Sequence, residues 1–301
     1  MSGQIFIHIG PPKTATTSLQ VAAERLRDNR YFYAGTLQPR DRNSGSIAQQ
    51  LHQACLSGDK KGHQAAEKLR EECDFGKLVF LSEEMFLVHS GNVSWQQKLT
   101  ELHSFLVDAP VTILLTLRKP TDALPSLYQE LFRDVPLVQK LSFSSFCRND
   151  YANCFDYDFL LSEISSAGFQ RVRLIDFTRL TSPSLSTSEV FGLDTDMAVN
   201  TLDVGWENKG KTGQVTNQRQ LPSVTFKNLA DAPGARWLID HTLRRDSSLR
   251  KMLSRSAEQL SLRGPHQRNL VVPREVGQRL DQIYLRHVAE GYGTINFLQR
   301  S

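Results

Sequence analysis

IFIHIGPPKTATTSLQ (residues 5–20) contains the pattern that decides the fold. An apolar, β-branched run stops at Gly10, two prolines follow, and an amphipathic periodicity begins within the next few residues. Such a pattern predicts a buried strand that passes through a tight turn directly into a helix. A strand followed at once by a helix is the repeating unit of an α/β fold with a parallel sheet.

Further strands and helices are predicted by the same patterns along the first 180 residues. Short apolar runs predict buried strands at QIFIHI (4–9), KLVFLS (77–82), VTILLTL (111–117) and RVRLIDF (171–177). Helical periodicity is present in residues 16–28 and 95–107. Alternation of strands with helices predicts an α/β fold of three layers, in which helices flank a central parallel sheet.

The length of 301 residues suits one large domain, 1–301. Residues 1–193 are expected to form the α/β core, and residues 194–301 a mostly helical C-terminal part that covers the substrate. Helical patterns at 234–260 and 274–293 support that expectation. TSPSLSTSE (181–189) is expected to be a surface loop.

Composition excludes several classes of protein. No apolar stretch has the length of a membrane span, and MSGQIFIHIG lacks the features of a signal peptide, so a cytoplasmic protein without an integral membrane segment is expected. The four cysteines have no zinc-site spacing. Residues 201–301 hold 16 Lys and Arg against 9 Asp and Glu, but no nucleic-acid motif appears, so nucleic acid is not an expected partner.

The turn after the first predicted strand has the composition of an anion site. Backbone N–H groups and the helix dipole favour a phosphate or sulfate at a helix N-terminus. Lys13 supplies a charge beside that terminus, and hydroxyl groups come from Thr14, Thr16, Thr17 and Ser18. The alternative is that these hydroxyls only cap the helix.

A second candidate anion site follows the strand at 111–117. In LLTLRKPTDALPSLYQELF (114–132), Arg118 comes at the end of the strand and Ser126 lies eight residues further on. Ligands of open parallel sheets gather at the carboxyl ends of the strands, so Arg118 and Lys13 are expected to face one crevice. Two anion sites there imply a ligand with two separated phosphates.

The two motifs resemble those of sulfotransferases that use 3′-phosphoadenosine 5′-phosphosulfate (PAPS), of the bacterial or carbohydrate-acting type. PKTATTSL (12–19) is similar to the family's 5′-phosphosulfate loop, and RKPTDALPSLY (118–128) is similar to its 3′-phosphate motif. A weaker likeness continues to about residue 193. The resemblance implies a P-loop-like fold, PAPS as co-substrate, and adenosine 3′,5′-bisphosphate (PAP) as product, with no metal.

The resemblance also implies roles for individual residues. Lys13 is expected at the bridging and 5′-phosphate oxygens, and Arg118 and Ser126 at the 3′-phosphate. The 5′-phosphate would be surrounded by the backbone and hydroxyl groups of Thr14, Ala15, Thr16, Thr17 and Ser18. NKGKTG (208–213) is only loosely similar to the segment that closes over the 3′-phosphate, so its contacts Lys209, Gly210 and Lys211 have a solvated turn as the alternative.

Ala15 departs from the family, which usually has glycine there. A positive φ would strain alanine, and a right-handed turn is expected instead.

The acceptor is expected to be a hydroxyl of a carbohydrate or small metabolite, and it needs a general base. FLSEEMF (80–86) places Glu83 and Glu84 just past a strand. The resemblance implies that Glu84 faces the crevice, because the family's related segment has a carboxylate three residues after the apolar end of the strand. Glu83 then faces outward by strand alternation, and surface acids are the alternative for both. His8 is a further candidate, but a histidine in an apolar strand is more often a hydrogen-bonded core residue.

Two other functions remain open from the sequence. One is a P-loop nucleotide kinase or ATPase, although residues 10–18 lack the second glycine of GxxxxGK[ST]. The other is a silent binding module, although Lys13 and both glutamates are present. The oligomeric state and the identity of the acceptor are not encoded in any motif.

Overall fold

A computed structural model of the chain describes residues 3–26, 28–37, 45–181, 185–191, 201–202, 218–221, 224–225, 261–263, 266–290 and 294–297. The chain divides into two compact units. The first comprises Met1–Pro120, Asn153–Lys211 and Arg279–Ser301, and the second comprises Thr121–Ala152 and Thr212–Gln278.

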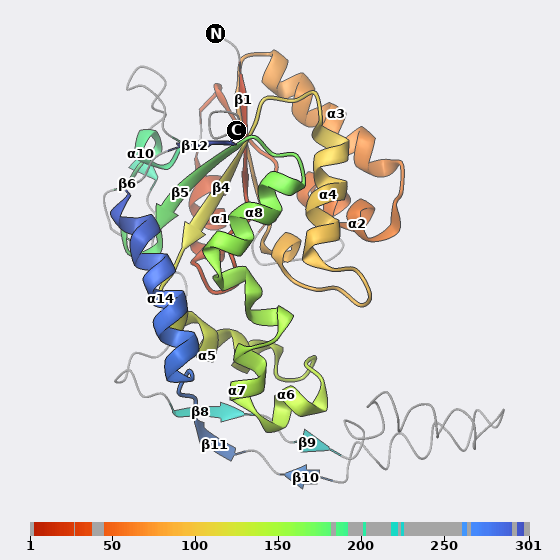
Figure 1. The fold of residues 1–301 in the computed structure, drawn as a ribbon. Coiled ribbons are helices and arrows are strands. Elements are labelled where there is room, and N and C mark those ends of the chain that lie inside the picture. Colours follow the sequence, from red (N-terminus) through yellow and green to blue (C-terminus); the bar gives the residue numbers. More distant parts are fainter. Residues whose placement is uncertain are drawn as a thin grey trace, which may run out of the picture. The chain divides into compact units, whose positions relative to one another are not determined.

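The first unit is built on a six-stranded sheet, in the order β12-β5-β4-β1-β3-β2 (Figure 1). Its strands are β1 (Gln4–His8), β2 (Tyr31–Tyr33), β3 (Leu78–Ser82), β4 (Val111–Leu117), β5 (Arg171–Asp176) and β12 (Thr294–Asn296). Strands β1 to β5 are parallel, whereas β12 pairs with β5 in the antiparallel direction. The sheet is therefore mixed, although a purely parallel sheet was expected.

All four expected strands are confirmed. Strands β3 and β4 are buried along their whole length, which explains why they appear as continuous apolar runs rather than alternating ones. The two additional strands, β2 and β12, have three residues each, and a run of three is too short to have a recognisable period.

Helices of the first unit lie on both faces of the sheet, and with it they form an α/β fold of three layers. They are α1 (Thr16–Arg25), α2 (Ile47–Ser57), α3 (Lys61–Asp74), α4 (Trp95–Leu106), α8 (Tyr157–Ser166), α9 (Phe177–Leu180) and α10 (Thr187–Phe191), with one 3₁₀ turn, η1 (Glu84–Leu87). The helices expected at 16–28 and 95–107 are confirmed as α1 and α4. A capping box between Ser94 and Gln97 fixes the start of α4.

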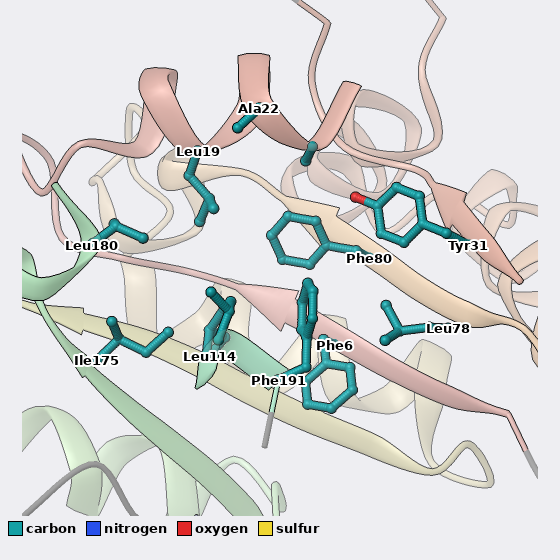
Figure 2. Packing of buried hydrophobic residues seen from close by; sticks show 12 residues of the cluster. Phe6, Leu19, Ala22, Tyr31, Leu78, Phe80, Leu114, Ile175, Leu180 and Phe191 are labelled. Atoms are coloured by element: carbon teal, nitrogen blue, oxygen red, sulfur yellow. The ribbon is translucent and has the colours of Figure 1, made fainter. Parts of the chain in front are cut away.

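One hydrophobic cluster joins α1 to the sheet. Figure 2 shows Leu19 and Ala22 of α1 above the rings of Phe6 and Phe80, with Phe191 beside them. Full burial of a side chain as large as Phe6 contributes roughly 1.5–3 kcal/mol. This packing fixes the start of α1 relative to the carboxyl end of β1.

The short strands β6 (Leu185–Ser186) and β7 (Thr201–Leu202) pair with each other in the first unit. Residues 185–191 thus form a strand and α10, so the expectation of a loop throughout 181–189 was wrong there. Val190 and Phe191 of α10 are buried in the cluster described above. Their burial stabilises a helix that the serine- and threonine-rich sequence does not favour.

The second unit contains α5 (Pro120–Leu131, which begins at the boundary), α6 (Leu137–Leu141) and α7 (Phe143–Cys147). The Tyr128 hydroxyl donates to the carbonyl oxygens of Gln139 and Lys140, and its ring packs against Phe143 and Phe146. The second unit also has two antiparallel strand pairs, β8 (Gln218–Leu221) with β11 (His266–Asn269) and β9 (Val224–Thr225) with β10 (Ser261–Arg263).

Besides α5, whose first residue belongs to the first unit, two elements contain residues of both units: η2 (Asp150–Phe155) and α14 (Arg274–Ala289). Helix α14 confirms the helix expected at 274–293, whereas the one expected at 234–260 lies outside the described residues. Among the described residues of 194–301 there are six short strands and one helix, so "mostly helical" does not describe them. No helix in the described ranges combines the length and apolar character needed to cross a membrane.

Candidate anion-binding site

The topology places a switch point at the carboxyl ends of β1 and β4. The chain leaves β1 for β2 and β3 on one side, whereas β4 and β5 lie on the other side of β1. The loops that follow β1 and β4 lead toward opposite edges of the sheet. Ligands of open α/β sheets bind in the crevice between two such loops. The segment after β1 and Arg118, which follows β4, therefore lie where a ligand of such a sheet would bind.

The segment between β1 and α1 has an unusual backbone. Among the described residues, Lys13 (φ 72°) and Ala15 (φ 62°) are the two non-glycine residues with a positive φ. The right-handed turn expected at Ala15 was therefore wrong, because Ala15 is left-handed with ψ 25°. Left-handed residues in such turns direct consecutive N–H groups to one side, which is the geometry of an anion-binding nest.

Side-chain contacts stabilise the backbone of the segment between β1 and α1. The Thr14 hydroxyl is buried and donates to the Pro11 carbonyl oxygen at 2.6 Å. A Cβ atom on Gly10 would lie 2.5 Å from the Thr14 hydroxyl oxygen and 2.8 Å from Nε2 of His8, so only glycine fits there. Thr14, expected as a phosphate ligand through its hydroxyl, thus uses that hydroxyl within the turn.

The N-terminus of α1 has the features of an anion site. Its N-cap residue, Ala15, makes no side-chain capping hydrogen bond, and its first turn contains no acidic residue. The first N–H groups of a helix have no intrahelical partner, which leaves those at Thr16, Thr17 and Ser18 for a ligand. The buried Thr16 hydroxyl oxygen has no hydrogen-bond partner among the described residues. A buried, unsatisfied hydroxyl beside free N–H groups indicates a place where a polar ligand binds.

Replacing Ala15 with glycine tests whether the left-handed turn is strained. A left-handed conformation costs a Cβ-bearing residue about 1–2 kcal/mol, and glycine removes that cost while adding entropy to the unfolded chain. We expect Ala15→Gly to leave the free energy of unfolding unchanged or to raise it by up to about 1 kcal/mol. Ala23→Gly within α1 should lower it by about 1 kcal/mol or more in the same urea titrations. Equal losses in both variants would contradict a strained Ala15.

His8 lies directly beneath this turn, in the core of the sheet. Its Nδ1 is 2.9 Å from the Ser82 hydroxyl of β3, and its Nε2 is 2.9 Å from the Thr116 hydroxyl of β4. Burial lowers the pKa of His8 to about 3, so the ring is neutral at physiological pH. With both nitrogens bonded, His8 has the placement of a core histidine, the alternative weighed against a catalytic one.

Arg118 reaches the loop after β1. Its guanidinium donates to the carbonyl oxygen of Lys13 and lies over the ring of Phe177, with 4.5 Å between the guanidinium carbon and the ring centroid. These contacts bring together the two charged residues that the sequence expected at one edge. Arg118 also stabilises the left-handed Lys13, because it binds the carbonyl group of that residue.

The two glutamates after β3 differ from expectation. Glu83 is buried rather than outward, and its carboxylate accepts from the Thr36 hydroxyl at 2.6 Å and from the backbone N–H of Met85 at 2.9 Å. Strand alternation fails here because β3 ends at Ser82 and Glu83 caps η1. Glu84, the first residue of η1, is partly exposed. Of the two carboxylates, Glu84 is the one with solvent access.

Lys98 of α4 holds the other end of η1. Its buried ammonium group donates to the carbonyl oxygens of Met85 and Val88, and to the Ser90 hydroxyl at 3.2 Å. Burial lowers its pKa to about 8. An anion at the N-terminus of η1 and a cation at its C-terminus both match the dipole of the turn.

Lys98→Met tests how strongly η1 is held. Methionine keeps the apolar stem but leaves two carbonyl groups without their donor, at a cost of about 1–3 kcal/mol each in a fully buried setting. We expect a net loss of about 1–3 kcal/mol in the free energy of unfolding, because removal of a buried charge offsets part of the cost. Lys68→Met, at an exposed position of α3, should stay within about 0.5 kcal/mol of wild type. A similar effect of both substitutions would contradict the role of Lys98.

For several residues that were expected to contact the nucleotide, the structure does not show a position near this site. Ser126 lies half-buried on α5 in the second unit, and it is described only within that unit. Lys209, Gly210 and Lys211 lie outside the described residues. The contacts of Phe177, Thr36 and Lys98 were not expected from the sequence. Of these three residues, only Phe177 could have been found from the sequence, because it directly follows a predicted strand, β5, at the carboxyl edge where ligands bind.

Comparison of the sequence with protein-family models finds no match, and comparison with curated proteins finds none either. Any assignment of function therefore depends on the two motifs and on the geometry around them.

Proposed function

We propose that the chain is a PAPS-dependent sulfotransferase with a P-loop-like nucleotide site. The observation that carries the proposal is the contact of the Arg118 guanidinium with the backbone of Lys13, beside the uncapped N-terminus of α1. This contact joins the loop and the arginine of the two motifs that resemble the family. A helix N-terminus with a lysine and an arginine suits a ligand that carries more than one phosphate.

We place the two phosphate-bearing ends of PAPS separately at the carboxyl edge of the sheet. The 5′-phosphosulfate would lie at the nest formed by residues 13–15 and at the N–H groups of Thr16, Thr17 and Ser18. Lys13 Nζ would contact the bridging oxygen. The 3′-phosphate would be bound by Arg118, with Ser126 and the segment Lys209–Lys211 as further contacts proposed from the resemblance alone.

The reaction follows from that placement. The acceptor oxygen forms a bond to sulfur as the bond between sulfur and the 5′-phosphate oxygen breaks, and PAP leaves with the electron pair. Negative charge grows on the bridging oxygen in the transition state, where Lys13 and the backbone N–H groups stabilise it. The acceptor proton passes to a base. PAPS is consumed and PAP is released in each turnover.

Glu84 is proposed as that base, for an acceptor hydroxyl on a carbohydrate or small metabolite. The carboxylate of Glu83 already binds Thr36 and Met85, and His8 has both ring nitrogens bonded and a pKa lowered to about 3. Neither group suits proton abstraction from an acceptor near neutral pH. Glu84 is partly exposed at the carboxyl end of β3, beside β1.

Thermal unfolding with added nucleotides tests the proposal without knowledge of the acceptor. PAP at a hundredfold excess over its dissociation constant should stabilise the folded protein by about 2.7 kcal/mol, equally with Mg²⁺ and with EDTA. ATP should give a smaller shift. A shift that requires both ATP and Mg²⁺, with none from PAP, would overturn the proposal in favour of a nucleotide kinase or ATPase.

A further inference from the structure

Phe177 and Arg118 occupy equivalent positions at the ends of neighbouring strands. Leu117 of β4 is in register with Asp176 of β5, and each of the two residues follows one position later. This register brings the Phe177 ring to 4.5 Å from the Arg118 guanidinium carbon. Phe177 is partly buried and belongs to the first unit, as Arg118 does.

The main chain of Arg118 is fixed separately by Tyr157. The Tyr157 hydroxyl accepts the backbone N–H of Arg118 at 2.8 Å and donates to its carbonyl oxygen at 2.7 Å. Burial raises the pKa of Tyr157, so the hydroxyl keeps the proton that it donates. With the backbone held this way, the direction of the side chain depends on what contacts the guanidinium.

The position of Phe177 is itself braced. Asp176, the residue before it, caps α9 by accepting from the backbone N–H of Thr178 at 3.3 Å, and it accepts from the Tyr284 hydroxyl at 2.6 Å. Asp176 and Tyr284 are both buried. The turn that presents the Phe177 ring is therefore anchored to the core rather than to a surface loop.

We propose that Phe177 is a positioning residue that aims the Arg118 guanidinium at the second phosphate of the nucleotide and so determines preference for a 3′-phosphate. The inference deepens the proposed function and rests on it. An aromatic ring stabilises a guanidinium without consuming any of its five N–H donors. The Lys13 carbonyl oxygen accepts from the guanidinium and the Phe177 ring contacts its face, so the ring constrains the direction of the guanidinium without occupying an N–H donor.

Binding calorimetry with two ligands tests the inference, because PAP carries a 3′-phosphate and adenosine 5′-monophosphate does not. Phe177→Leu keeps an apolar side chain but removes the aromatic face, and it should weaken PAP binding by about 5–10-fold. Binding of the monophosphate should change by less than about twofold, because that ligand has no group for Arg118. Phe177→Tyr, which keeps the ring, should bind PAP as wild type does.

A double-mutant cycle separates positioning from a structural effect. In the Arg118→Ala background, adding Phe177→Leu should change PAP affinity by less than about twofold, because the side chain that Phe177 holds is gone. An equal loss of PAP and monophosphate binding in Phe177→Leu, or a further loss in the double variant, would overturn the inference. If Phe177→Leu does not fold, Phe177→Met supplies the same comparison.

PAP binding by the wild-type protein distinguishes a failure of this inference from a failure of the proposed function. Wild-type protein that fails to bind PAP overturns the proposed function and the inference together. PAP binding that Arg118→Ala weakens and Phe177→Leu leaves unchanged overturns the inference alone.

Discussion

Lys13→Ala will lower the rate at which labelled sulfate is released from PAPS by about 10²–10³-fold. Lys13 is placed at the bridging oxygen, where charge grows only as the bond to sulfur breaks. PAP affinity should fall less, by about tenfold, because the product lacks that developing charge. The measurement is sulfate release to water in the absence of an acceptor, together with calorimetric binding of PAP.

The backbone makes this substitution informative. Lys13 has a φ of 72°, and alanine also carries a Cβ atom, so the substitution changes the charge without relieving the strained conformation. Lys61→Ala, at an exposed position of α3, is the matched control and should keep the wild-type rate. A Lys13→Ala protein that retains the rate within about threefold contradicts the role of Lys13 as a transition-state contact.

The free energy of unfolding will fall by about 2 kcal/mol between pH 7 and pH 5 because of His8 alone. The pKa of His8 is about 3 in the folded protein, against an ordinary value of 6.5 in the unfolded chain. Between these values the unfolded chain binds the proton and the folded protein does not. Lowering the pH therefore favours unfolding, by about 1.36 kcal/mol per pH unit once the pH is well below 6.5.

His8→Gln isolates this contribution. Glutamine can still bond to a neighbouring hydroxyl, but it does not titrate, so the variant should lose less stability than wild type when urea titrations at pH 7 and pH 5 are compared. The other histidines are common to both proteins and cancel in the difference. Identical pH dependence in the two proteins would show that His8 is not held neutral beneath the turn.

The strands and the location of the candidate site could be predicted from the sequence. Strands β3 and β4 are buried on both faces, and so their apolar runs are unambiguous. Parallel strands share one carboxyl edge, which is why Lys13 and Arg118 could be expected together from chain order alone. That expectation required no knowledge of side-chain conformations.

The finer features depend on tertiary packing and could not be predicted. Ala15 is left-handed although its residue type disfavours it, in a turn where the Thr14 and Arg118 side chains bind neighbouring carbonyl groups. Glu83 turns inward because β3 ends at Ser82 and Glu83 caps η1 instead of continuing the alternation of the strand. The contact of Phe177 with Arg118 depends on the register of β4 with β5, and no local pattern encodes register between strands that are far apart in the chain.

A crystal structure with bound PAP tests the central claim most directly. We expect the 5′-phosphate within hydrogen-bond distance of the backbone N–H groups of residues 14–18 and of Lys13 Nζ, with the 3′-phosphate on the Arg118 guanidinium. A nucleotide bound elsewhere, or an empty turn after β1 at saturating PAP, would contradict the claim that this turn and Arg118 form one nucleotide site.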